Sequence, residues 1–129
     1  MGLGAALAGS HLPADDAAPV DAMSATPRAG RKARDELSML PIVFEQARAL
    51  TSLSDRPLVV LTSAENARDS DGWTEAQEEM AGLSSNAVRR DAATSHAGIV
   101  EDANGAAASV EAIASVIRAV RTGAVVATP

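Results

Sequence analysis

Pro-Leu-Val-Val-Leu, at residues 57–61, is a short and uninterrupted apolar run in a chain of 129 residues. Polar pairs bound the run on both sides, Asp55-Arg56 before it and Thr62-Ser63 after it. A run of this length is typical of a strand that is covered on both faces, and such strands occur inside parallel sheets. Residues 57–61 therefore predict an α/β fold.

The segments after this strand continue the α/β pattern. A polar loop precedes apolar residues at helical spacing, which predict a helix from Trp73 to about Leu83. Residues 87–92 form a second, unusually polar strand candidate, because Arg89, Arg90 and Asp91 interrupt it. The order β-α-β implies two parallel strands joined by a right-handed crossover.

A final helix is predicted from a regular apolar stripe that ends at a glycine. Gly123 is a helix-stop signal, and the stripe consists of Val110, Ile113, Ile117 and Val120. We expect this helix to pack across the two strands. Two strands and one packing helix are too few to cover both faces of the sheet, so apolar surface stays exposed to water. The sequence therefore predicts an incomplete α/β unit that is marginally stable and prone to association when alone.

The first part of the chain is helical in character. Residues 15–50 are rich in helix formers, and the prolines at positions 19, 27 and 41 are each predicted to begin or end a helix. One apolar stripe there consists of Leu37, Leu40, Phe44 and Ala47. The sequence thus predicts a helical segment at 1–50, a β-α-β-α part at 51–123 and a tail at 124–129.

Composition excludes several classes of function. The net charge of -6 disfavours binding to nucleic acid or anionic lipid. The absence of cysteine excludes disulfides, thiolate metal sites and thiol nucleophiles, and the two histidines, His11 and His96, are too far apart for a metal motif. We therefore expect no metal and no cofactor. His11 is expected to be solvated or to cap a helix.

The amino-terminal residues give no targeting signal. Residues 1–12 are apolar but carry no Lys or Arg before the apolar run, and they are too few to span a bilayer, so we expect a cytoplasmic protein without a membrane partner. Ten of the eleven basic residues are arginine and 29 residues are alanine. This bias is typical of high-GC bacterial coding sequences, which indicates a bacterial origin.

Several motifs in residues 51–123 resemble the carboxy-terminal part of an α/β-hydrolase. They are the run from Arg56 to Thr62, the polar loop, the helix opened by Gly72-Trp73, the stretch Ser95-His96-Ala97-Gly98, and Glu101-Asp102 before the closing helix. The proline-punctuated helices of residues 1–50 are similar to the lid that this family inserts before its seventh strand. In the family, the loop after the seventh strand often carries the catalytic acid, and the loop after the eighth carries the catalytic histidine.

The resemblance implies two catalytic residues. His96 is the implied general base, and Glu65 is the first choice for the acid that orients it, although the family position falls near Asn66 and two aspartates follow at 69 and 71. The nucleophile elbow Gly-x-Ser-x-Gly is absent, and so is a His-Gly-Gly stretch for an oxyanion hole. Ser95 is an unsuitable nucleophile because adjacent side chains of an extended loop point apart.

Three readings follow from these observations. In the first, the chain is a truncated or split carboxylic-ester type hydrolase, inactive alone, whose partner is a complementing amino-terminal half or a second copy of itself. In the second, it is a small non-enzymatic helical interaction protein that uses residues 37–50. In the third, it is a complete minimal enzyme with an unrecognised nucleophile. The first reading accounts for the most residues.

Overall fold

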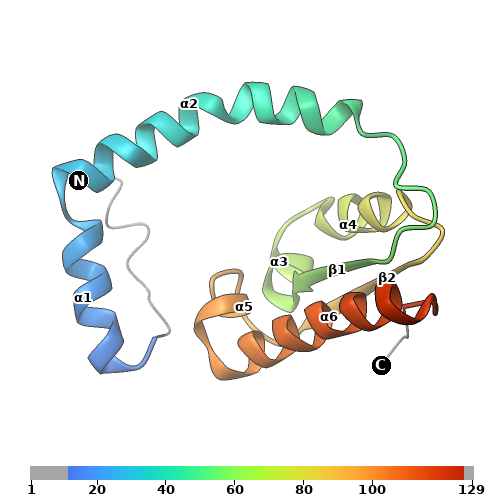
Figure 1. The fold of residues 1–129 in the computed structure, drawn as a ribbon. Coiled ribbons are helices and arrows are strands. Elements are labelled where there is room, and N and C mark those ends of the chain that lie inside the picture. Colours follow the sequence, from blue (N-terminus) through green and yellow to red (C-terminus); the bar gives the residue numbers. More distant parts are fainter. Residues whose placement is uncertain (1–11, 127–129) are drawn as a thin grey trace. The chain divides into compact units, whose positions relative to one another are not determined.

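The computed structural model describes residues 12–126, and the chain divides into two compact units, residues 1–50 and 51–129 (Figure 1). The described residues contain six helices and one sheet of two parallel strands. The predicted α/β class is therefore confirmed at this coarse level. None of the helices in the described range is long and apolar enough to cross a bilayer.

The described part of the first unit, residues 12–50, consists of two exposed helices, α1 (Ala14–Ser24) and α2 (Pro27–Ala49). Thr26 caps α2, because its hydroxyl accepts a hydrogen bond from the main-chain N of Ala29 at 3.1 Å, and Pro27 occupies the first turn. The prediction that prolines 19 and 41 delimit helices is wrong, since both lie inside helices. The φ that a proline ring imposes is helical, and a solvated helix can bend away from the ring clash.

The second unit is built on strands β1 (Leu58–Ser63) and β2 (Ala87–Ala92), which pair in parallel with Leu58 beside Ala87. The expected parallel arrangement is confirmed. The polar side chains of β2 have partners within the fold: Arg89 forms an ion pair with Asp91 at 2.8 Å, and Arg90 Nη2 donates to the distant Ser115 Oγ at 3.2 Å. These contacts explain how so polar a segment becomes a strand.

Two helices occupy the connection between the strands. The segment predicted as a loop contains α3 (Ala64–Asp69), which begins where β1 ends. The crossover helix α4 (Trp73–Ala81) begins after Gly72, whose φ of 76° is in the left-handed region that favours glycine. Gln77 is the buried residue of α4, so the helix turns a polar side chain toward the sheet.

Helices α5 (Gly98–Glu101) and α6 (Ala103–Thr122) follow β2, and α6 ends at Gly123 with a φ of 69°, as predicted. The sheet lies between α4 and α6 (Figure 1). The buried residues of α6 are small: Gly105, Ala112, Ser115 and Ala119. The apolar stripe predicted from the sequence is left exposed, because the small residues let the helix approach the sheet more closely.

Asp102 joins the end of β2 to the start of α6. Its Oδ1 accepts from the main-chain N of Gly105 at 2.6 Å, and its Oδ2 accepts from Thr94 Oγ1. We expect Asp102→Ala to lower the free energy of unfolding by about 2 kcal/mol, because it removes a helix cap and a partly buried hydrogen bond. Urea unfolding followed by circular dichroism measures the loss. Asp69→Ala is the control, since Asp69 pairs only with its exposed neighbour Arg68, and a loss equal to that of Asp102→Ala would contradict the assignment.

Candidate functional site

The carboxyl ends of β1 and β2 lie at the same edge of the sheet because the strands are parallel. Ser63, the last residue of β1, caps α3 by accepting from the main-chain N of Asn66 at 3.2 Å. This cap sets Glu65 and Asn66 in the first turn of α3. The main-chain N of Glu65 donates to the carbonyl of Thr94 at 3.4 Å, which ties α3 to the loop that follows β2.

His96 lies in that loop and meets residues from α3. Its main-chain N donates to Glu65 Oε2 at 3.3 Å, and its ring Nδ1 lies 3.5 Å from Asn66 Nδ2. The structure thus brings together the two residues singled out in the sequence, 31 positions apart. Glu65 contacts the backbone of His96, however, and the side chain that faces the imidazole is Asn66.

Trp73 adds a neighbour that the sequence did not assign to this site. Its indole N–H donates to Thr62 Oγ1 at 2.6 Å, and Thr62 is only 2% exposed. The indole ring of Trp73 and the imidazole ring of His96 form an edge-to-face contact, with ring centroids 6.1 Å apart and an interplanar angle of 84°. Nothing in the spacing of the sequence links Trp73 to His96, because the contact arises from where the crossover helix begins.

The loop that carries His96 is held by short-range contacts. Ser95 Oγ accepts from the main-chain N of Gly98 at 3.0 Å, which gives this hydroxyl a structural role. A side chain at Gly98 would overlap the side chains of Thr94 and Asp102. The Ser-His-Ala-Gly stretch is therefore a tight turn that fixes where His96 leaves the backbone.

This arrangement sets what the imidazole can do. The amide Nδ2 of Asn66 can donate a hydrogen bond to Nδ1 only in the tautomer that carries the ring proton on Nε2. If the amide turns over, its oxygen accepts from Nδ1–H and leaves Nε2 as the base, the orientation that triad chemistry requires. The nearby guanidinium of Arg68 pairs with Asp69 at 2.9 Å, and that hydrogen bond raises the pKa of Arg68.

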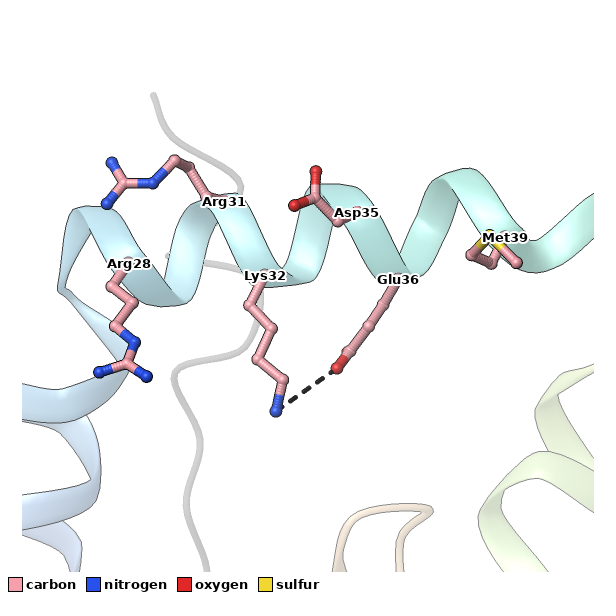
Figure 2. Close-up of a pocket in the computed structure, with 6 residues that line it drawn as sticks. All are labelled: Arg28, Arg31, Lys32, Asp35, Glu36 and Met39. Carbon is pink, nitrogen blue, oxygen red and sulfur yellow. Dashed lines mark ion pairs between the residues drawn. The ribbon is translucent and has the colours of Figure 1, made fainter.

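Within residues 12–126, no three His, Asp or Glu side chains lie close enough together to hold a metal ion. His11, the other histidine, lies outside the described residues. A hollow runs along α2 (Figure 2) and is lined by Arg28, Arg31, Lys32, Asp35, Glu36 and Met39. All six residues come from one helix. The Nζ of Lys32 lies 3.6 Å from Oε1 of Glu36, and both side chains are largely exposed. The hollow is therefore part of a solvated charged face of α2.

Replacing Asn66 with aspartate tests the Asn66–His96 contact directly. A carboxylate accepts a hydrogen bond from Nδ1–H, so we expect the chemical shifts of the His96 ring to change in Asn66→Asp relative to the native chain. Proton NMR of the ring signals measures this, with His96→Asn to assign them. The control is Asp69→Asn, on the last residue of α3. Unchanged ring signals of His96 in Asn66→Asp would show that the two side chains do not meet in solution.

No protein family model matches this chain, and neither a curated protein sequence nor a solved structure is significantly similar to it.

Proposed function

We propose that the chain supplies the histidine loop and the orienting loop of a split ester hydrolase of the α/β-hydrolase type. One observation carries the proposal: His96, after β2, meets Glu65 and Asn66, after β1, at the carboxyl edge of two parallel strands. Active sites of open α/β sheets form at this edge. The helical segment of residues 1–50 has the place in the chain that a lid has in that family.

Asn66 supports a triad in which an amide replaces the acid. Cysteine proteases of the papain type use Asn in this position, so an amide can hold an imidazole in its productive orientation. Glu65 then acts on the backbone of the His96 loop and not on the ring. The nucleophile and the oxyanion donors come from a second segment, because the sequence has no Gly-x-Ser-x-Gly.

The test begins with the chain alone. A lone imidazole without a nucleophile or oxyanion donors has little transition state to stabilise, so the purified chain is expected to hydrolyse a short-chain nitrophenyl ester no faster than a heat-denatured control. Saturable turnover by the chain alone would instead favour a complete minimal enzyme.

The second step adds the missing segment. The coding sequence that adjoins this chain is searched for an apolar strand followed by Gly-x-Ser-x-Gly, and that segment is expressed together with the chain. We expect saturable ester hydrolysis from the mixture. If no such segment is found, or if the mixture shows no turnover, the proposal is wrong.

A non-enzymatic interaction protein is the second candidate function. The observation that favours it is the exposure of the predicted stripe on α2, where Leu37 is 59% and Phe44 54% exposed. Surfaces of this kind are typical of helices that bind a partner. If the chain is an interaction protein, Phe44→Glu should abolish binding of the partner to α2, whereas His96→Ala should leave this binding unchanged.

A further inference from the structure

The carboxyl end of β1 buries two adjacent hydroxyl side chains. Thr62 is 2% exposed and Ser63 is 0% exposed, and they are the largest fully buried side chains in residues 12–126. Burial of a hydroxyl costs free energy unless the group is hydrogen-bonded. The hydrogen-bond partners of these two residues therefore indicate why polar groups occupy the end of an otherwise apolar strand.

Thr62 holds the first of two side chains that meet the imidazole of His96. Its Oγ1 accepts a hydrogen bond from the indole N–H of Trp73 at 2.6 Å. The indole in turn lies edge-to-face with the His96 ring, with the ring centroids 6.1 Å apart. An indole has a single N–H donor, so this hydrogen bond fixes the direction in which the ring of Trp73 points.

Ser63 holds the second side chain. Its Oγ accepts from the main-chain N of Asn66 at 3.2 Å and caps α3, which sets the place of Asn66 Nδ2, 3.5 Å from His96 Nδ1. Successive side chains of a strand point to opposite faces. The two hydroxyls therefore act through two different helices, Thr62 through α4 and Ser63 through α3.

We propose that Thr62 and Ser63 are positioning residues, which set the orientation of the His96 imidazole through Trp73 and Asn66. They act through the side chains that meet the imidazole, so neither is a catalytic residue. Their effect on catalysis rests on the proposed function, whereas the orientation of the ring is a property of the chain alone.

Proton NMR of the His96 ring signals in the chain alone tests the role of Thr62. The ring current of an indole shifts nearby protons, so Trp73→Leu gives the size of the shift that the indole causes. Thr62→Val nearly keeps the shape of the side chain and removes the acceptor, so we expect the His96 signals to move by a large part of that shift. Thr62→Ser returns a hydroxyl and should restore the native signals.

Ser84→Ala is the matched control for a purely structural effect. Ser84 is also buried, at 7% exposed, and its hydroxyl donates to the carbonyl of Arg56 at 2.6 Å, at the amino end of the sheet. The substitution therefore removes a buried hydrogen bond from the same unit, far from the candidate site. It should leave the His96 ring signals unchanged.

Ser63→Ala tests the second hydroxyl. Without the cap, the first turn of α3 is less well held, so we expect the side-chain amide signals of Asn66 and the ring signals of His96 to change together. Asn66→Ala assigns the amide signals and shows which ring changes come from the loss of this contact. A changed Asn66 amide beside an unchanged His96 ring would contradict the role of Ser63.

Kinetics of the complemented hydrolase separate the two proposals. Thr62→Val should lower kcat about tenfold or more and leave KM nearly unchanged, because a misplaced base slows the chemical step without weakening substrate binding. If the mixture shows no turnover but the NMR changes occur as expected, the proposed function is wrong and the positioning of the ring stands.

Three outcomes would overturn the role of Thr62. The first is a set of His96 ring signals that Thr62→Val leaves unchanged. The second is a shift in Ser84→Ala as large as that in Thr62→Val, which would indicate a general loosening of the unit. The third is a Thr62→Ser variant that keeps the altered signals of Thr62→Val, which would show that the hydroxyl is not what holds the indole.

Discussion

Gly105→Ala is expected to destabilise the second unit by about 3 kcal/mol or more, a large part of the roughly 5–15 kcal/mol that holds a domain folded. A β-carbon at Gly105 would lie 2.7 Å from Ile99 Cα and closer still to the carbonyl of Gly98. Both contacts are with main-chain atoms, which cannot rotate away as side chains do. Helices α5 and α6 must therefore separate to admit one methyl group.

Urea unfolding followed by circular dichroism measures this loss. The matched control is Gly30→Ala in α2, where a β-carbon meets nothing within 4 Å. That substitution should stabilise its helix by about 0.5–1 kcal/mol, because alanine loses less backbone entropy than glycine. If Gly105→Ala unfolds at the same urea concentration as the native chain, the close contact between α5 and α6 is absent in solution.

His96→Ala should lower the ester hydrolysis of the complemented protein about 100- to 10,000-fold, the usual contribution of a positioned general base. The ring nitrogen that faces Asn66 is lost together with the nitrogen that would take the proton from the nucleophile. Steady-state kinetics on a short-chain nitrophenyl ester measure the effect, which should fall on kcat.

Two further variants separate base catalysis from loop structure. Glu65→Gln is also expected to lower turnover, and less severely, because Glu65 accepts from the main-chain N of His96 and an amide oxygen can replace that acceptor. Val100→Asp, outside the site, should leave turnover unchanged. Equal rates for the native protein and His96→Ala would remove His96 from the mechanism.

The parallel sheet could be predicted because two local signals agree. Residues 57–61 are continuously apolar, and the helical segment that follows them is long enough for a crossover. Helix α3 escaped prediction because its six residues show no apolar periodicity, and its start depends on the Ser63 cap. The prolines in α1 and α2 misled the prediction, since a solvated helix tolerates a bend that a packed one does not.

The resemblance to α/β-hydrolases singled out Glu65 and His96, and the structure brings these two residues into contact. Which side chain faces the imidazole could not be predicted, because neighbouring residues on a helix differ by 100° in direction. Whether Glu65 or Asn66 faces the imidazole therefore depends on where α3 begins, which the sequence does not reveal. The face of α6 that packs on the sheet could not be predicted either. Apolarity alone favours the stripe of larger apolar residues, whereas the structure buries the small residues of this helix.

The contact between Trp73 and His96 also allows the candidate site to be followed by intrinsic tryptophan fluorescence. Trp73 is the only tryptophan and the chain has no tyrosine, so nearly all of its near-ultraviolet emission comes from one indole beside the imidazole. A protonated imidazole at this distance quenches indole fluorescence, and a molecule that displaces the His96 loop changes the same signal. The protein thus carries a built-in optical probe of its candidate site, which needs no label and no substrate.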